Sequence, residues 1–219
     1  MTQTGATGPA KVSLTKSAPA VSLAKHDPAG GGGGRITINL NWDAGGGGQQ
    51  GGGGGLRALF RRKDPTIDLD LGCLYELASG KKSAVQALGD SFGSFDGPPY
   101  IKLDKDDRSG TASDGENLFL NQAHAADIKR ILIYAFIYEG AASWAAAKPV
   151  VTVRQQGGPA VEVVLDETDP QKTMCAVALI ENTGGGDLQV SRQVRYFEGH
   201  EDMDKAFAWG LNWVAGSKD

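Results

Sequence analysis

Short alternating segments, separated by turn residues and without helical patterns between them, constrain the fold of this chain most. The clearest is RITINLNWD (35–43), where every second residue is apolar, as in a strand with one buried face. The connections lack the helical segments of about 10–15 residues that parallel βαβ units need. The sequence therefore predicts an all-β protein, an antiparallel β-sandwich with the strands 67–77 and 131–139 near its centre. The other expected strands are 83–88, 99–103, 149–154, 160–165, 173–181 and 188–197.

Four further segments add detail to this expectation. AASWAAA (141–147) and EDMDKAFAWGLNW (201–213) have apolar residues at helical spacing, which predicts one or two short helices, although Gly210 weakens the second. Near the start of the chain, VSLTK (12–16) recurs as VSLAK (21–25). The recurrence is too short for a solenoid repeat and predicts two short strands.

Glycine marks the expected domain organisation. Nine of the first twelve residues of the segment 44–63 are glycine, which favours a flexible insertion between two strands. A flexible insertion is tolerated because the entropy of loop closure rises slowly with length. We therefore expect a disordered N-terminus at 1–10, one domain over 11–214 that contains this insertion, and a tail at 215–219.

Charge and composition exclude several classes of function. The net charge of −4 argues against nucleic acid as the main partner, and no apolar run approaches the roughly 20 residues of a membrane span. The N-terminus lacks the apolar core of a secretory signal. Cys73 and Cys175 lie in apolar, strand-like runs, where we expect buried free thiols in a reducing compartment. The expected location is the cytoplasm.

None of the common enzyme motifs that the sequence suggests is complete. GDSFG (89–93) has the spacing of a nucleophile elbow, but Pro98 and Pro99 exclude the helix that must follow it. The three histidines are far apart in the sequence, and Cys and His do not cluster at the spacing of a zinc site. The basic segment LRALFRRK (56–63) is either a solvated linker end or a docking segment for an acidic partner or membrane surface.

Two carboxylates share one face of the predicted strand in DPTIDLDLG (64–72). Because side chains alternate along a strand, Leu69 and Leu71 face one side while Asp68 and Asp70 lie about 7 Å apart on the other. Two such like charges repel each other unless water or a cation screens them.

A second acidic segment, YIKLDKDDRSGTASDGENLFL (100–120), forms a loop rich in oxygen donors between two apolar runs. Ca²⁺ takes six to eight oxygen ligands, whereas Mg²⁺ demands a tighter octahedron. The spacing does not fit an EF-hand, and a solvated acidic loop is the alternative interpretation. If the loop and the acidic strand meet at one end of the sandwich, they form a Ca²⁺ site. Its candidate ligands are Asp68, Asp70, Asp104, Asp106, Asp107, Ser109, Asp114 and Glu116.

Several motifs in this order resemble one protein family. LNWD (40–43), IDLDLG (67–72) and the DDRSG…DGEN loop (106–117), together with the VSLTK start, are similar to the TerD family of tellurium-resistance and stress proteins. The similarity is greatest to its TerA-type members and covers most of residues 11–214 apart from the glycine-rich insertion. The resemblance implies a calcium-binding β-sandwich of the bacterial cytoplasm that functions in tellurite resistance or a broader chemical-stress response. It also implies sister Ter-type proteins and a TerC-type membrane protein as partners.

The resemblance also implies which residues bind the metal. The Asp-x-Asp strand of the family falls on Asp68 and Asp70, and the acidic pair before its loop turn falls on Asp106 and Asp107, followed here by Ser109 in place of the usual Thr. The family's Asp-Asp-Glu sequence is Asp114-Gly115-Glu116 in this chain. Gly115 removes one ligand and the loop is about one residue shorter, so the sequence leaves open whether there are one or two sites.

The sequence is compatible with three functions. The first is a non-enzymatic calcium-binding module that acts through protein partners. The second is a metal-free scaffold for protein interactions. The third is a hydrolase that uses a bound cation to activate water. The acidic residues make the third conceivable, but the sequence offers no general base outside the proposed ligands.

Overall fold

The computed structural model describes residues 11–23, 34–42, 68–104, 115–139, 143–156 and 158–214. The predicted disordered N-terminus, flexible insertion and C-terminal tail fall on residues 1–10, 44–63 and 215–219, which lie outside these ranges. Their properties, and the division into one domain with tails, therefore stay predictions.

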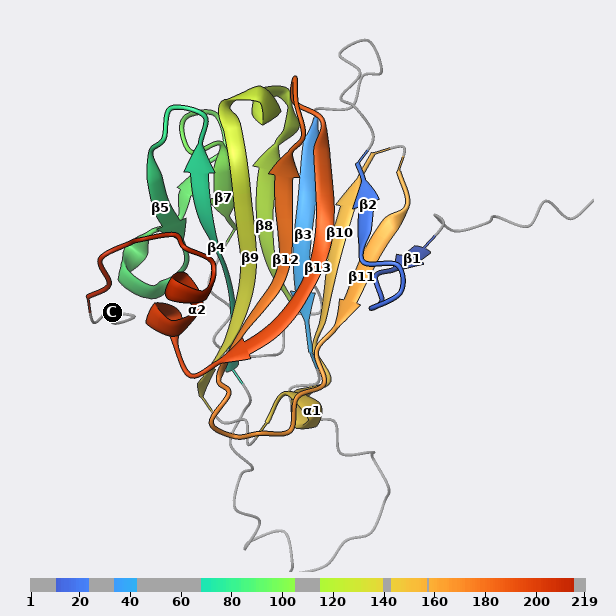
Figure 1. The fold of residues 1–219 in the computed structure, drawn as a ribbon, viewed down its shortest axis with the longest axis vertical. Coiled ribbons are helices and arrows are strands. Elements are labelled where there is room, and N and C mark those ends of the chain that lie inside the picture. Colours follow the sequence, from blue (N-terminus) through green and yellow to red (C-terminus); the bar gives the residue numbers. More distant parts are fainter. Residues whose placement is uncertain are drawn as a thin grey trace, which may run out of the picture.

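Two β-sheets lie face to face (Figure 1). The first contains, in spatial order, β1 (Lys11–Ser13), β11 (Ala160–Val164), β10 (Val150–Gln155), β3 (Arg35–Asn41), β8 (Glu116–Asn121), β7 (Ile101–Leu103) and β6 (Gly93–Ser94). The second contains β2 (Ala20–Ser22), β13 (Leu188–Phe197), β12 (Met174–Asn182), β9 (Ile128–Glu139), β4 (Asp68–Leu77) and β5 (Lys82–Val85). The pairs are antiparallel apart from β1 with β11, which is parallel. The predicted all-β sandwich is confirmed, with this one parallel pair as an addition.

The core lies between the sheets because alternating apolar residues face it. Ile36, Ile38 and Leu40 of β3 are fully buried, as the alternation in the sequence predicts. The predicted pairing of β4 with β9 is also confirmed, and both strands are internal to their sheet. Apolar burial of this extent is the main source of stability in such a fold.

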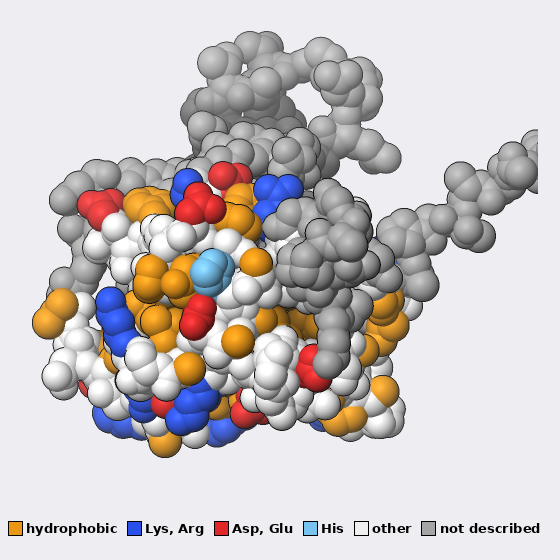
Figure 2. Space-filling view, turned by 90° about the horizontal axis from the view of Figure 1, so that it is seen from above, with side chains coloured by type: hydrophobic (Ala, Val, Ile, Leu, Met, Phe, Trp, Pro, Cys, Tyr) orange, Lys and Arg blue, Asp and Glu red, His pale blue; other side chains and the backbone are white. Residues whose placement is uncertain are grey.

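The outer face of the second sheet carries a second, smaller core. Helix α2 (His200–Ala206) and the segment after it cover this face beside β4 and β9 (Figure 1). Met203 and Trp209 pack there against Leu74 and Tyr134. Consequently all ten residues of β4 are buried, five facing each way. Figure 2 shows acidic, basic and hydrophobic side chains interspersed over the end of the sandwich seen from above.

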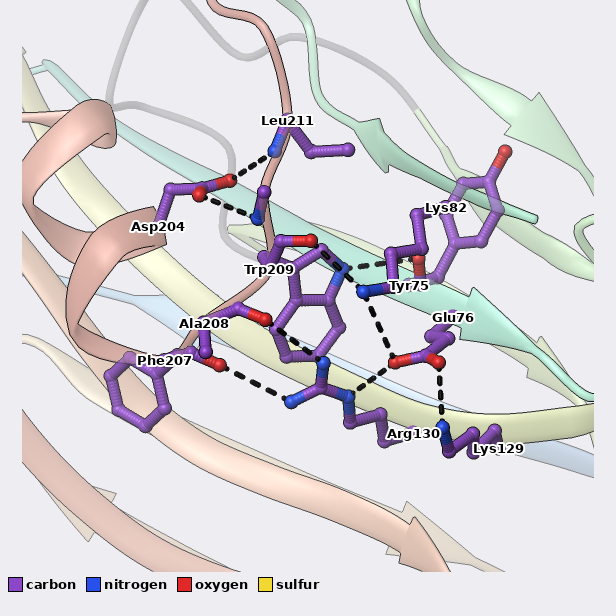
Figure 3. A network of polar contacts seen from close by, with 11 residues as sticks. Tyr75, Glu76, Lys82, Lys129, Arg130, Asp204, Phe207, Ala208, Trp209 and Leu211 are labelled. Carbon is purple, nitrogen blue, oxygen red and sulfur yellow. Dashed lines mark hydrogen bonds and ion pairs between the residues drawn. The ribbon is translucent and has the colours of Figure 1, made fainter. Parts of the chain in front are cut away.

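One buried carboxylate ties the C-terminal segment to the sheet (Figure 3). Glu76 accepts hydrogen bonds from Lys129 Nζ at 2.7 Å and Arg130 Nε at 2.6 Å, with Lys82 Nζ at 3.8 Å. The Arg130 guanidinium lies over the ring of Trp209, 3.9 Å from its centroid. Lys82 donates to the Trp209 carbonyl oxygen at 3.0 Å. The three cations thus balance Glu76, and two of them, Lys82 and Arg130, also hold the segment after α2.

Two local predictions need correction, and two others are confirmed at least in part. The second predicted helix, 201–213, ends at Ala206, because Ala208 (φ 50°) and Gly210 (φ 79°) adopt left-handed conformations. The other predicted helix is confirmed in part as α1 (Trp144–Ala147). The two N-terminal repeats do form short strands, but β1 joins the first sheet and β2 the second. Finally, β8 was expected only as an apolar run after the loop, not as a strand. Short 3-10 turns η3 (Leu88–Asp90) and η4 (Gln122–Asp127) complete the described structure.

Candidate metal site

The first half of β4 lies beyond the end of its neighbour β5, which pairs only with Cys73 to Glu76. Glu116 extends to this stretch from β8 in the opposite sheet. Its Oε2 accepts a hydrogen bond from the backbone N–H of Leu71 at 2.7 Å. Glu116 is fully buried. This contact places Glu116, at the end of the acidic segment, against the backbone of the acidic strand.

Asp68 and Asp70 are buried, not solvated. Asp70 has no exposed surface and Asp68 is 6% exposed, so water does not screen the two charges from each other as it would on a solvated strand face. Both residues take part in interactions, but the buried oxygens Asp68 Oδ1 and Asp70 Oδ2 accept no hydrogen bond within the described structure. Burial of a carboxylate disfavours its charged form unless other groups or ions compensate for the lost water.

The ring of Tyr134 covers β4 next to Asp70. A Cβ at Gly72 would lie 2.5 Å from this ring, so only glycine fits beneath it. The Tyr134 hydroxyl donates to Gln86 Oε1 at 2.6 Å. Burial first, and then the charges of Cys73 and Asp70, raise the pKa of Tyr134 well above its ordinary value. Tyr134 therefore stays neutral beside the acidic strand.

Both ends of the acidic loop are fixed at this end of the sandwich. The backbone N–H of Asp104 donates to the Asn117 carbonyl at 2.9 Å, and Asp104 itself is exposed. At the other end, Gly115 precedes Glu116. The loop between them contains the predicted ligands Asp106, Asp107, Ser109 and Asp114, which lie outside the described residues.

The structure explains why glycine occupies position 115. Gly115 has φ 61°, and a Cβ there would lie 2.0 Å from the carbonyl oxygen of Leu40 in β3. An acidic side chain at this position would therefore clash with the neighbouring strand. Close packing of β3 against the loop end therefore accommodates glycine at this position.

The described side chains do not by themselves make a complete cation site. Within the described ranges, no group of three or more His, Cys, Asp and Glu side chains is arranged to hold a metal ion. Of the eight predicted ligands, the structure brings Glu116 to the strand of Asp68 and Asp70 and places Asp104 at the start of the loop. Carboxylate oxygens are donors that Ca²⁺ prefers, so the chemistry of these side chains is compatible with calcium, while their role as ligands stays a prediction.

Sequence reasoning assigned Glu116 to the loop and missed its place in a strand. The signal was available: Glu116, Leu118 and Leu120 alternate with Asn117 and Phe119, so the three share one face. In the structure this face points into the sandwich, and all three residues are fully buried. Alternation therefore predicts an inward-facing carboxylate.

Among the described residues, neither the two cysteines nor the GDSFG motif provides an activated nucleophile. Cys73 and Cys175 are buried free thiols, as predicted, and burial raises the pKa of Cys73 to about 12. A thiol that stays protonated is a poor nucleophile and a poor redox group. Ser91 of the GDSFG motif donates to the carbonyl oxygen of Ala84 at 3.0 Å.

Comparisons with known proteins identify the family. The chain is 46% identical over 208 residues to the tellurium resistance protein TerA of Alcaligenes sp.. This chain belongs to the TerA/TerD family of tellurium-resistance proteins. The match includes 95% of this chain and 58% of the relative, so the chain spans little more than half of that TerA protein's length. No family model matches the chain.

Solved structures support the fold of this TerA/TerD-family chain. A homologue of the telluride resistance protein TerD, SCO6318 from Streptomyces coelicolor A3(2), matches with a TM-score of 0.50 over 79% of this chain and 95% of that one. The protein of unknown function SAV2460 matches with a TM-score of 0.52 over the same shares. Both are 19% identical to this chain, which shows a common fold. None of the helices in the described residues has the length and apolar character to cross a membrane.

Proposed function

We propose that this chain is a calcium-binding, non-enzymatic module of a tellurite-resistance or chemical-stress response. The tellurium assignment is supported by the 46% identity to a tellurium resistance protein, TerA of Alcaligenes sp.. The calcium assignment depends on one observation: Glu116 crosses from the opposite sheet to the buried strand that carries Asp68 and Asp70.

The physical case for a cation is one of charge. Asp70 and Glu116 have no exposed surface and Asp68 is 6% exposed, and removal of each carboxylate from water costs several kcal/mol. A hard cation offsets this cost, and Ca²⁺ accepts the flexible geometry that a loop provides. Asp104 and the loop residues Asp106, Asp107, Ser109 and Asp114 are the proposed remaining ligands.

The proposed mode of action is binding to protein partners in the bacterial cytoplasm. The resemblance implies sister Ter-type proteins and a TerC-type membrane protein as these partners. Nucleic acid is not an expected partner because the chain is acidic overall. The buried, protonated cysteines and the lack of a candidate general base outside the metal ligands favour a role without catalysis.

Calorimetry on chelator-treated protein tests this function. We expect saturable heat on addition of Ca²⁺ and a rise in melting temperature, because binding to the folded state alone stabilises it. Mg²⁺ is the matched control and should give a smaller response. Lack of heat and of stabilisation up to millimolar Ca²⁺ would refute the calcium assignment.

The two alternatives predict different results in the same samples. A metal-free scaffold would keep its stability and its partner binding in EDTA, with no response to Ca²⁺. A metal-assisted hydrolase would turn over phosphate esters with Ca²⁺, Mg²⁺ or Mn²⁺. We expect no turnover with any of the three ions.

A further inference from the structure

A pocket lies on the outer face of the first sheet, at the end where β3 begins and β10 ends. It has a volume of about 430 Å³ and is lined by Arg35, Thr37, Phe95, Arg154, Gln155 and Gln156. This is the opposite end of these strands from Gly115, which contacts Leu40 at the end of β3. The pocket is therefore separate from the candidate calcium site.

The charge of the pocket is positive although the chain is acidic overall. The lining residues within the described ranges contribute two guanidinium groups and no carboxylate. Arg154 lies directly opposite Thr37 in the pairing of β10 with β3, so Arg35, two residues earlier, is its diagonal neighbour on the same face. Neither guanidinium forms an ion pair with any residue in the described ranges. Two like charges at neighbouring sheet positions attract an anion.

The orientation of Arg35 leaves its hydrogen-bonding edge available. Its guanidinium carbon lies 4.9 Å from the centroid of the Phe119 ring. This stacking occupies the flat face of the guanidinium, while its N–H groups point outward from the edge. Two parallel N–H groups of one guanidinium match two oxygens of a phosphate or carboxylate. Arg35 therefore packs on an aromatic ring, and its guanidinium donates no hydrogen bond to a residue in the described ranges.

Neutral polar groups complete the lining. Gln155 Oε1 is buried and accepts no hydrogen bond from the described residues. A Cβ at position 158 would lie 2.4 Å from Gln155 Nε2, so Gly158 makes room for this amide. In the pairing of β10 with β3, Gln155 lies opposite Ile36 and so belongs to the other face of the sheet from Arg154, and it borders the pocket at the strand end. The Thr37 hydroxyl and the Gln156 amide supply further donors.

We infer that this pocket binds an oxyanion, with Arg35 and Arg154 as the charged ligands. Phosphate, a phosphate ester and tellurite share the required chemistry: several oxygens and a negative charge. Phe95 also borders the pocket. The inference does not depend on the calcium proposal, because the two sites share no residue.

The test uses the full chain in EDTA, so that the calcium site cannot contribute and calcium salts do not precipitate. Inorganic phosphate, a simple phosphate monoester and tellurite are titrated separately against chloride at equal ionic strength. The readouts are calorimetry and the NMR signals of the Arg35 and Arg154 Nε–Hε groups. We expect at least one anion to give a saturable response at millimolar concentration or below, with both arginine signals shifted. The anion that binds most tightly identifies the source of the ligand.

Variants assign the response to the pocket. Arg154→Gln should weaken binding about tenfold or more, because it removes a charge-assisted bidentate contact. Arg154→Lys keeps the charge but not the fork and should lose less. Arg192→Gln, in β13 of the other sheet, is the matched control and should bind as the parent does. The inference is overturned if none of the three anions exceeds chloride, or if the arginine signals of the parent do not shift. Equal binding by parent and Arg154→Gln would also overturn it.

Discussion

The strand β4 carries buried acidic residues at both ends, and the two ends balance their charge differently. At its C-terminal end, Glu76 is surrounded by three cations from its own chain, Lys82, Lys129 and Arg130 (Figure 3). At its N-terminal end, Asp68 and Asp70 are buried, and the carboxylate of Glu116 from the opposite sheet accepts a hydrogen bond from the backbone N–H of Leu71. One end surrounds its carboxylate with cations, whereas the other end carries two buried carboxylates and receives a third from the opposite sheet at its backbone.

The difference shows whether each end of β4 needs an added ion to balance its charge. Burial alone would raise the pKa of Glu76, but hydrogen bonds from Lys129 and Arg130, with the charges of Arg130 and Lys82, lower it overall. That end is a structural clamp on the C-terminal segment and needs no added ion. The other end acquires its charge balance, on our proposal, from Ca²⁺. Four experiments test this contrast, in order of decreasing expected effect.

Removal of the charge on Glu76 should have the largest effect. Glu76→Gln leaves the partly buried cations without their anion, and we expect a loss of about 3 kcal/mol in the free energy of unfolding. The loss should be the same in EDTA and in Ca²⁺, as measured by urea denaturation. Glu201→Gln, which breaks an exposed pair with Lys205, is the control and should change stability by less than about 1 kcal/mol. A loss that depended on Ca²⁺ would show that the charge balance at Glu76 also requires an added ion, contrary to the proposed difference between the two ends.

An added side chain at Gly115 tests how closely the loop end packs. Gly115→Ala should destabilise the fold by about 2 kcal/mol, because it combines a left-handed backbone with a clash against the Leu40 carbonyl. Gly80→Ala has a left-handed backbone but open space around it, so it should cost only about 1 kcal/mol. Thermal melts of the two variants measure the difference. Equal losses of stability in the two variants would show that the contact between position 115 and the Leu40 carbonyl adds no destabilisation.

Neutralisation of Asp70 should reverse the order of stability between two conditions. In EDTA, Asp70→Asn should be as stable as the parent or slightly more so, because it relieves repulsion worth on the order of 1 kcal/mol. In Ca²⁺ it should be less stable, because it loses a charged ligand and gains less from binding. Asp166→Asn, outside the proposed site, should follow the parent. If Asp70→Asn keeps the parent's calcium response, β4 is not part of a calcium site.

The smallest effect concerns His200, which packs on the outer face of β4 and β9 between the two ends. Its ring contacts Tyr134 and Phe136, and burial lowers the pKa of His200 to about 4. The unfolded chain, with a histidine pKa of about 6.5, then binds more protons between these values. The free energy of unfolding should therefore fall as the pH decreases through this window, by about 1 kcal/mol for this partly exposed group.

His200→Gln isolates this contribution. The difference in unfolding free energy between neutral and mildly acidic pH should be smaller in the variant than in the parent, because the variant has no titrating group there. NMR titration of His200 in the parent provides a direct reading of its pKa. An ordinary histidine pKa would show that the side chain is solvated and that α2 does not seal this face.

The sequence predicted most strands because alternation is a local signal. Ile36, Ile38 and Leu40 define β3 without any knowledge of what covers them. The prediction of a helix beyond residue 206 is wrong because the apolar residues keep helical spacing there, whereas the backbone is no longer helical. Asp204, near the end of α2, accepts hydrogen bonds from the N–H groups of Gly210 and Leu211 and so favours the extended path. Such capping is not visible in apolar periodicity.

The sequence by itself determined the β-sandwich, the family and the acidic residues of the proposed calcium site. Strand alternation and ordered motifs are patterns of neighbouring residues, so they can be recognised without the fold. Only the tertiary structure decided that Glu116 reaches Leu71 and that Asp70 is buried. It alone decided that Arg35 and Arg154 share a pocket. These facts depend on strands 45 residues or more apart in the chain being placed side by side or face to face. Contacts of that kind arise from packing of the whole chain, which no local pattern specifies.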